Sequence, residues 1–155
     1  MKLTRWKNQN PNKMTGPESD YIITEIKTIF HKMTEYSQNA QSDSFLSCYA
    51  NSPDFLHFSS DGSMRNYEEF KKICIEYYHS LKDQKVITTR EKFQVLDTNL
   101  VILGWTGNII ARFMNGDTMK MGNYSVTFVF KNIDRKWKII HSHESALPPE
   151  LIKKE

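Results

Sequence analysis

The stretch that decides the fold lies near the end of the chain and reads Trp137-Lys138-Ile139-Ile140-His141-Ser142-His143-Glu144-Ser145. We interpret it as a final β-strand, in which successive side chains point to opposite faces of a sheet. His141 and His143 then share one side, and Ser142 and Glu144 share the other. A polar strand of this kind at the end of a curved sheet is typical of a ligand cavity or a subunit interface. The pattern does not name the ligand.

A run of strands is predicted to surround this stretch. The four long strands cover residues 86–96, 100–114, 118–131 and 136–145. Asn115-Gly116 is a strong signal for a two-residue hairpin loop between the second and third of them. Such a loop sets a register in which Trp105 opposes Val126. Pro148-Pro149 is expected to end the sheet.

This register divides the side chains of the two central strands between two faces. The face with the bulkier apolar groups is expected to meet the helices, and it collects Val101, Leu103, Trp105, Ile109, Ala111, Phe113, Tyr124, Val126, Phe128 and Phe130. The other face is mixed and includes Met119 and Met121. Burying it against a second copy would gain roughly 25 cal/mol per Å² of apolar area. We therefore expect a homodimer through this outer face, the alternative being a sheet with one solvated face.

The first half of the chain predicts three helices and one short strand. Asp20 is the expected N-cap of a long helix, since apolar residues recur at helical spacing after it. A short second helix begins at Ser42-Asp43, a short strand covers residues 54–59, and Asn66 opens a third helix with Glu69 completing a capping box. This order predicts an α+β fold: a cone-shaped, curled antiparallel sheet with three N-terminal helices packed on its concave face.

Length and charge limit the function classes. The 155 residues are enough for one domain. We expect a disordered polar head at 1–19, the domain at 20–149 and a tail at 150–155. The net charge is +3, but the head carries four positive charges and no acid before Glu18, which leaves the rest near neutral. A near-neutral body argues against nucleic-acid binding.

The sequence also argues against a membrane protein, because no apolar run is long enough to span a bilayer. The N-terminus lacks the apolar centre of a secretory signal, so we expect a cytoplasmic protein. Cys48 and Cys74 lack metal-binding spacing and are expected to be buried free thiols. The sequence holds no phosphate loop, nucleophile elbow or zinc spacing, and no cofactor or metal is expected.

The last strand, together with Val126-Thr127-Phe128-Val129-Phe130, resembles the ending of SnoaL-like proteins of the nuclear-transport-factor-two-like superfamily. The nearest pattern is that of the calcium/calmodulin-dependent kinase II association (hub) domain, whose last strand has the form Trp-x-x-x-His-x-His-x-Ser. The resemblance covers roughly residues 21–149. It implies a cone-shaped α+β barrel, a homodimer or larger assembly, and a deep pocket between helices and sheet.

This sequence departs from the hub domain at the pocket. The arginines that line the pocket of that domain align with Trp105, Phe128 and Glu144 here. A cationic pocket has become an aromatic one with a single acid. We therefore expect a small, largely apolar molecule, neutral or cationic, rather than a carboxylate anion.

Two residues are candidates for acid–base chemistry. Glu144 would have a raised pKa in an apolar wall and would suit a general base. His57 sits on the first strand, where enzymes of the superfamily often place an acid–base residue. The expected ligand-binding residues are Tyr49, Tyr77, Trp105, Tyr124, Phe128 and Ser142. For each aromatic residue the alternative role is core packing.

The facing of the last strand depends on the loop before it. A two-residue turn at Ile133-Asp134 would point His141 and His143 inward, whereas a three- or five-residue loop would point Ser142 and Glu144 inward. The family resemblance favours the second arrangement. Binding of a small molecule without catalysis is the first functional hypothesis. An isomerase- or cyclase-type enzyme is the second, and a pure oligomerisation module is the third.

Overall fold

The computed structural model describes residues 14–154. Its elements are α1 (Pro17–Gln38), α2 (Ser42–Leu46), β1 (Leu56–Phe58), β2 (Met64–Arg65), α3 (Tyr67–Ser80), β3 (Leu81–Asp97), β4 (Leu100–Phe113), β5 (Thr118–Ile133), β6 (Lys136–Ser145) and β7 (Glu150–Ile152). Most of the head predicted at 1–19 lies outside the described residues. Its last three residues are helical, because α1 begins at Pro17.

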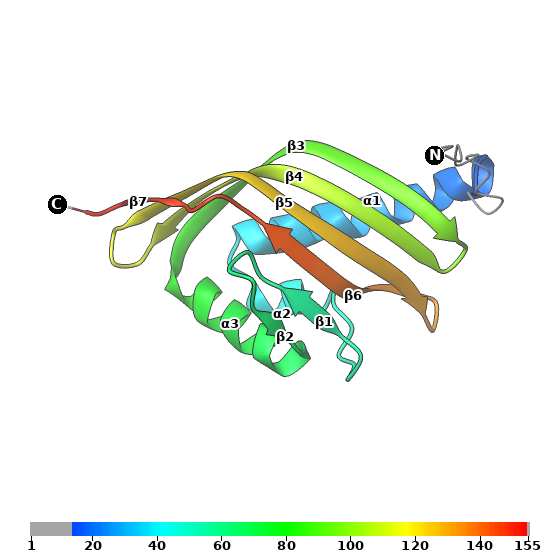
Figure 1. Ribbon diagram of the computed structural model, residues 1–155, viewed down its shortest axis with the longest axis horizontal. Coiled ribbons are helices and arrows are strands. Elements are labelled where there is room, and N and C mark those ends of the chain that lie inside the picture. The colour runs from blue at the N-terminus through cyan, green and yellow to red at the C-terminus, as the bar shows by residue number, and fades with distance from the viewer. Residues whose placement is uncertain (1–13, 155) are drawn as a thin grey trace, which may run out of the picture.

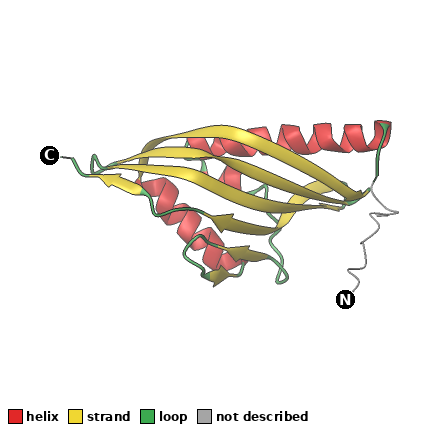
Figure 2. Cartoon of the chain, turned by 45° about the horizontal axis from the view of Figure 1, so that its top comes forward, coloured by secondary structure: helices red, strands yellow, loops and turns green. Residues whose placement is uncertain are grey.

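One curled sheet holds all seven strands, in the order β2-β1-β6-β5-β4-β3, with β7 added beside β5. Strands β3 to β6 form an antiparallel meander, and β1 runs parallel to β6. The helices lie on one side of this sheet (Figure 1). In the turned view of Figure 2, α1 runs along the length of the curved strands. The predicted α+β cone with three N-terminal helices is confirmed.

The helices form where the sequence predicts them, with differences at their ends. Gly16, not Asp20, is the N-cap of α1, since Pro17 occupies the first turn, where a missing N–H costs nothing. The capping box of Asn66 and Glu69 at the start of α3 is confirmed. Leu81, which continues the apolar stripe of that helix, instead begins β3.

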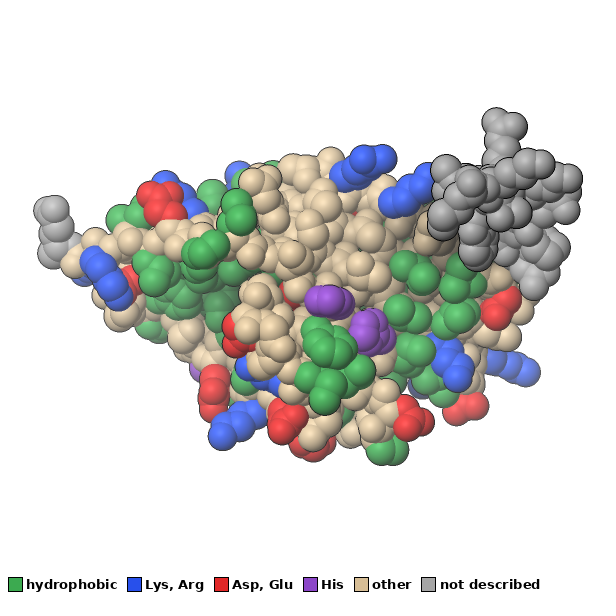
Figure 3. All heavy atoms as spheres, in the orientation of Figure 1, with side chains coloured by type: hydrophobic (Ala, Val, Ile, Leu, Met, Phe, Trp, Pro, Cys, Tyr) green, Lys and Arg blue, Asp and Glu red, His purple; other side chains and the backbone are tan. Residues whose placement is uncertain are grey.

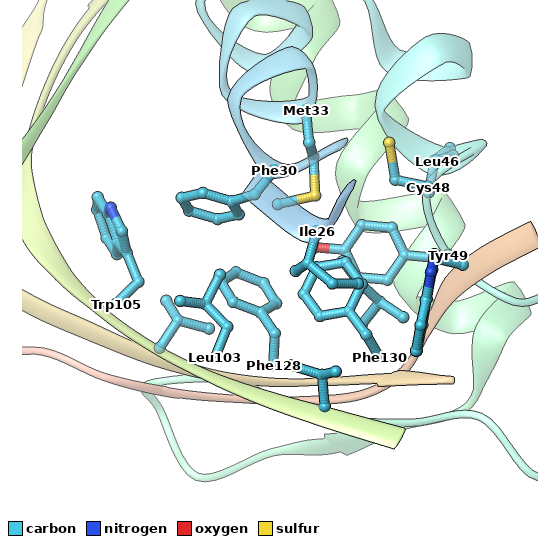
Figure 4. Packing of buried hydrophobic residues seen from close by; sticks show 14 of the residues in the cluster. Ile26, Phe30, Met33, Leu46, Cys48, Tyr49, Leu103, Trp105, Phe128 and Phe130 are labelled. Atoms are coloured by element: carbon cyan, nitrogen blue, oxygen red, sulfur yellow. The ribbon is translucent and has the colours of Figure 1, made fainter. Parts of the chain in front are cut away.

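The core lies between α1 and the concave face of the sheet. From α1, Ile26, Phe30 and Met33 point toward the strands, and they meet sheet residues such as Leu103, Trp105, Phe128 and Phe130 (Figure 4). Phe30 lies 5.6 Å from Phe128 and 6.4 Å from Trp105, measured between ring centroids. The apolar stripe of α1 therefore packs on the face that the sequence assigned to the interior.

The hairpin between β4 and β5 differs from the prediction in a way that changes the cavity. The loop holds three residues, 114–116, because Phe113 N donates to Asp117 O. A bulge then adds one residue to β5 between the pairs Gly107–Tyr124 and Ile109–Met121. The two differences cancel beyond the bulge, so the predicted pairing of Trp105 with Val126 is confirmed.

In the segment between the loop and the bulge, the longer loop shifts the register by one residue. The prediction that Met119 and Met121 lie on the outer face is therefore wrong. These side chains line the interior with Ile109 rather than the outer face. A one-residue shift moves every side chain of a strand to the other face of the sheet. The outer face is accordingly less apolar than the sequence indicated.

A second bulge decides the facing of the last strand. The turn between β5 and β6 has two residues, Asp134 and Arg135, both with positive φ. Such a turn alone would point His141 inward. An extra residue in β6 between the pairs Phe130–Ile139 and Val129–His141 reverses the facing, so that Ser142 points inward. The expectation that Ser142 and Glu144 point inward is therefore correct, but the three- or five-residue loop expected before β6 is wrong.

The chain also continues the sheet beyond Pro148-Pro149. Strand β7 pairs antiparallel with residues 118–120 of β5, and Lys153 forms an ion pair with Asp117 at 2.8 Å. The expectation that these prolines end the sheet is wrong, and the tail predicted at 150–155 contributes a strand. Within residues 14–154, no helix combines the length and apolar character needed to cross a membrane.

Candidate ligand-binding and acid–base site

The concave side of the sheet and the helices enclose a cavity of about 390 Å³. Seven of the eight residues named from the sequence line it: Tyr49, His57, Tyr77, Trp105, Tyr124, Phe128 and Glu144. Ser142 does not line it, because its side chain is covered by His57. Most of the wall is apolar or aromatic, and the polar groups gather in two places.

The first polar group lies where β1 meets β6. Parallel pairing sets His57 of β1 beside Ser142 of β6, and the antiparallel register sets Val126 beside Glu144. His57 and Glu144 are 87 residues apart in the sequence. These pairings bring them together, so that His57 Nε2 lies 3.9 Å from Glu144 Oε1. We call the four residues His57, Ser59, Arg65 and Glu144 the acid–base pole.

His57 is fixed by hydrogen bonds at both ring nitrogens. Nδ1 lies 2.8 Å from Ser142 Oγ, and Nε2 lies 3.0 Å from Ser59 Oγ. The ring packs on Phe70 with centroids 4.5 Å apart. Burial, followed by the positive charge of Arg65, lowers the pKa of His57 to about 4. His57 is therefore a neutral imidazole at physiological pH.

Glu144 faces the cavity with its side chain 26% exposed. Burial raises the pKa of Glu144 above its ordinary value. The Tyr124 hydroxyl, the Ser60 backbone and Arg65 oppose this shift without cancelling it. A carboxyl with a raised pKa, held beside a neutral histidine, has the character of a proton acceptor in a partly dry site.

Four tyrosine side chains line the same cavity as this carboxyl. Burial raises the pKa of Tyr49, Tyr77, Tyr78 and Tyr124, and the charge of Glu144 adds to each shift. These hydroxyls stay protonated, and those of Tyr77 and Tyr78 already donate to other side chains. Cys74 lines the same cavity, and burial raises the pKa of its thiol to about 12, so it is not a nucleophile at neutral pH.

The second polar group lies near the start of β3. The Tyr77 hydroxyl donates to Gln84 Oε1, and Gln84 Nε2 donates to Ser37 Oγ at 2.7 Å. The Tyr78 hydroxyl also donates to Ser37 Oγ, at 3.0 Å. This network ties α1, α3 and β3 together across the cavity. It explains why Gln84 is buried without leaving its amide unsatisfied.

Trp105 is held in place from two sides. Its indole Nε1 donates to Thr88 Oγ1 at 3.0 Å, so the polar atom of the ring is already used. Its ring lies over Gly107, where an added Cβ would stand 2.4 Å from Cζ2. Trp105 therefore presents an apolar surface to the cavity.

Sequence reasoning missed several residues that shape the site, among them Ser37 and Gln84 of the second polar group. Ser59 and Arg65 were missed because they enter only through the β1–β2 hairpin, which has no clear periodic signal. Met119 and Met121 were assigned to the wrong face because the loop before them holds three residues and not two. Two local signals mark the β5 bulge: Gly122, a glycine inside a strand, and Asn123, with φ of 52°.

The two histidines of the last strand lie on the opposite face. His141 and His143 flank the ring of Phe58, at centroid distances of 6.0 and 5.3 Å. Histidine side chains beside a hydrophobic cluster are visible at the surface in Figure 3. Within the described part of the chain, no three His, Cys, Asp or Glu side chains are arranged to hold a metal ion. Both cysteines are buried and free, as expected.

The fold and the site together define the class of this protein. It is a small α+β domain in which a curled sheet and its helices enclose an aromatic cavity with one inward carboxyl. The model of the SnoaL-like domain family matches residues 26–149. The chain therefore belongs to the SnoaL-like family, which confirms the resemblance seen in the last strands. No curated protein matches the sequence of this chain.

Solved structures share this fold at low sequence identity. A nuclear transport factor 2-like superfamily protein from Salmonella enterica serovar Typhimurium has a TM-score of 0.74 at 15% identity, covering 84% of this chain and 94% of that one. A type 2 hexachlorocyclohexane dehydrochlorinase has a TM-score of 0.72 at 8% identity, covering 88% of this chain and 92% of that one. A candidate calcium/calmodulin-dependent kinase II association domain from Xanthomonas campestris has 0.67 at 19% identity, covering 94% and 99%.

Proposed function

We propose that this protein binds a small, largely apolar molecule in the cavity between its sheet and helices. The observation that carries this proposal is the cavity itself. Its volume of about 390 Å³ lies in the range of ligand sites, and a few convergent polar groups interrupt an apolar wall. Tyr49, Trp105 and Phe128 would contact the apolar body of the ligand, and Glu144 would receive a hydroxyl or amino group.

A binding assay with a blocked cavity tests this proposal. The probe is 4-hydroxybenzophenone, whose two rings suit an aromatic wall and whose phenol can donate to Glu144. At a hundredfold excess over its dissociation constant, a ligand stabilises the folded state by about 2.7 kcal/mol, which a thermal-shift assay detects.

The matched variants are Met121→Trp, which fills the cavity from β5, and Thr127→Trp, which adds the same ring to the outer face of that strand. We expect the first variant to lose the thermal shift and the second to keep it. Equal shifts in both variants would contradict binding in the cavity.

A second candidate function is an enzyme of the isomerase or cyclase type, with Glu144 as general base. The raised pKa of this inward carboxyl favours it. His57 is the weaker candidate for the base, since its two nitrogens already have hydroxyl partners and its pKa is lowered to about 4. The reaction most suited to this arrangement is proton abstraction beside a carbonyl.

Deuterium exchange tests this second function. Deoxybenzoin carries acidic C–H groups beside its ketone, and NMR in D₂O follows their replacement by deuterium. We expect the wild-type protein to accelerate the exchange and Glu144→Gln to abolish the acceleration. The rate should rise with pH through the raised pKa of Glu144, above 4.5, because the ionised carboxylate is the base. Equal acceleration by wild type and Glu144→Gln would refute the role of Glu144.

We also propose that the protein forms a homodimer through the outer face of the sheet. This face keeps half-buried aliphatic side chains from neighbouring strands, namely Ile102, Ile110, Val129 and Ile140. Ile102 and Val129 are directly paired across β4 and β5. The support is narrower than the sequence indicated, because Met119 and Met121 belong to the cavity.

A further inference from the structure

The hydrogen bonds of the acid–base pole fix which atoms can still bind a ligand. Ser142 is 1% exposed, and among the described residues its hydroxyl has one partner, His57 Nδ1. A buried hydroxyl hydrogen without an acceptor is costly, so the Ser142 O–H donates to Nδ1. Nδ1 is then unprotonated, and the single proton of the neutral imidazole is on Nε2.

This tautomer determines the state of Ser59. The His57 Nε2–H donates to Ser59 Oγ at 3.0 Å. Arg65 Nη1, which can only donate, also bonds Ser59 Oγ. These two donors occupy both lone pairs of the Ser59 oxygen. The Ser59 hydroxyl hydrogen must therefore find its acceptor elsewhere.

The remaining direction for this hydrogen is the cavity. Ser59 is part of the cavity wall, and within residues 14–154 its hydroxyl donates to no other group. A hydroxyl that accepts from a guanidinium and an imidazole is polarised by both and becomes a stronger donor. Arg65 is in turn held by Asp61, at 3.8 Å between Nη2 and Oδ2.

We infer that the Ser59 hydroxyl is a ligand-binding group that donates a hydrogen bond to a carbonyl oxygen of the bound molecule, with His57 and Arg65 as positioning residues. This inference rests on the proposed binding function and narrows the ligand class to ketones and related carbonyl compounds. Glu144 lies close to the same pole, 3.9 Å from His57 Nε2. The site therefore offers a donor for a carbonyl oxygen beside an acceptor for an acidic hydrogen.

A pair of probes isolates the carbonyl contact. The probes are 4-hydroxybenzophenone and 4-benzylphenol, which differ only by a carbonyl or a methylene between the rings. Calorimetry gives the affinity of each. We expect the wild-type protein to bind the ketone about tenfold more tightly, as for one hydrogen bond from a polarised donor. The infrared C=O stretch of the bound ketone should move to lower frequency than in an apolar solvent.

Variants of Ser59 and Arg65 then test the assignment. Ser59→Ala should bind both probes with similar affinity and remove the infrared shift, whereas Ser59→Thr should keep both effects. Ser125→Ala, on the outer face of β5, is the control and should behave as wild type. Arg65→Gln retains the Ser59 hydroxyl and should reduce the infrared shift without weakening 4-benzylphenol. It provides the test if Ser59→Ala does not fold.

The outcomes separate this inference from the proposed function. If the wild-type protein binds both probes equally and the C=O stretch is unshifted, the role of Ser59 is refuted while binding in the cavity stands. A preference for the ketone that survives in Ser59→Ala also refutes it, as does an unchanged infrared shift in Arg65→Gln. If the wild-type protein binds neither probe, the proposed function and this inference both fail.

Discussion

The tightest constraint at the scale of single residues is the contact between Gly107 and Trp105. A Cβ at Gly107 would stand 2.4 Å from the Trp105 ring and 2.5 Å from the carbonyl oxygen of Ile87. The ring is pinned by its bond to Thr88, and a backbone carbonyl cannot rotate away. Gly107 is thus required for the wall of the cavity, although its backbone adopts ordinary strand geometry.

This contact predicts that Gly107→Ala destabilises the protein by about 1–3 kcal/mol, the usual range for overpacking. Gly104→Ala is the matched control on the same strand, since its nearest atom beyond the neighbouring residues, Lys92 O, is 4.0 Å away. Urea denaturation measures both. Similar free energies of unfolding for the two variants would contradict the proposed clash.

His57 predicts a pH dependence of stability. Its pKa is about 4 in the folded protein and near 6.5 in the unfolded chain. Between these values the unfolded chain holds more protons, so the free energy of unfolding falls as the pH falls from 6.5 to 4. The difference between the two pKa values of His57 corresponds to a loss of about 3 kcal/mol in the free energy of unfolding.

Comparison with His57→Asn isolates this effect. The raised pKa of Glu144 acts with the opposite sign, because its ionisation disfavours the folded state as pH rises. Subtracting the variant's pH profile from that of the wild type removes most of the Glu144 contribution. The free energy of unfolding of the wild type minus that of the variant should decrease as the pH falls from 6.5 to 4. A difference that does not change with pH would contradict the buried neutral imidazole.

At the scale of elements, two bulges decide what the strands present to the cavity. The bulge in β5 brings Met119 and Met121 inward, and the bulge in β6 brings Ser142 inward. Each adds one residue to one strand and so reverses the facing of every residue beyond it. The cavity wall depends on these two irregularities as much as on the regular sheet.

Asn123 allows the β5 bulge to be tested. Its φ of 52° suits Asn or Gly, and its N–H donates to Asn108 Oδ1 at 3.2 Å. We expect Asn123→Val to cost about 1–2 kcal/mol, because a β-branched residue is strained in this conformation. Asn123→Gly should be nearly neutral. Thermal unfolding measures both, and equal stability of the two variants would show that the positive φ is not needed.

At the scale of the whole molecule, the curled sheet uses its two faces differently. The concave face is divided between the helices and the cavity, and the outer face carries the aliphatic side chains proposed to meet a second copy. Strand β7 lengthens the sheet beside β5, with Leu151 and Ile152 exposed. Exposed apolar side chains that adjoin a sheet face are typical of interaction surfaces.

Light scattering coupled to gel filtration tests the proposed dimer. The wild-type protein should elute with the mass of two chains. Val129→Lys places a charge in the aliphatic part of the outer face and should shift the protein to the monomer. Thr98→Lys, in the β3–β4 turn, is the control and should remain dimeric. A monomeric wild-type protein at high concentration would contradict the proposal.

Much of this architecture could be predicted because it is encoded locally. The apolar spacing of α1, the capping box at Asn66 and the alternation along β4 each report their element directly. The loop between β4 and β5 was mispredicted because Asn115-Gly116 also fits a three-residue loop, and only backbone pairing distinguishes the two. The facing of Trp105 could still be predicted, since the bulge offset the error.

The sequence by itself determined the order of the elements, the apolar face of the central strands and the set of aromatic and acidic residues available to the cavity. Only the tertiary structure decided which of them meet. His57, Ser59 and Arg65 reach Ser142 and Glu144 because β1 joins β6 in parallel. Such a pairing between distant segments leaves no periodic trace in either of them, because it depends on how the whole sheet curls around its core.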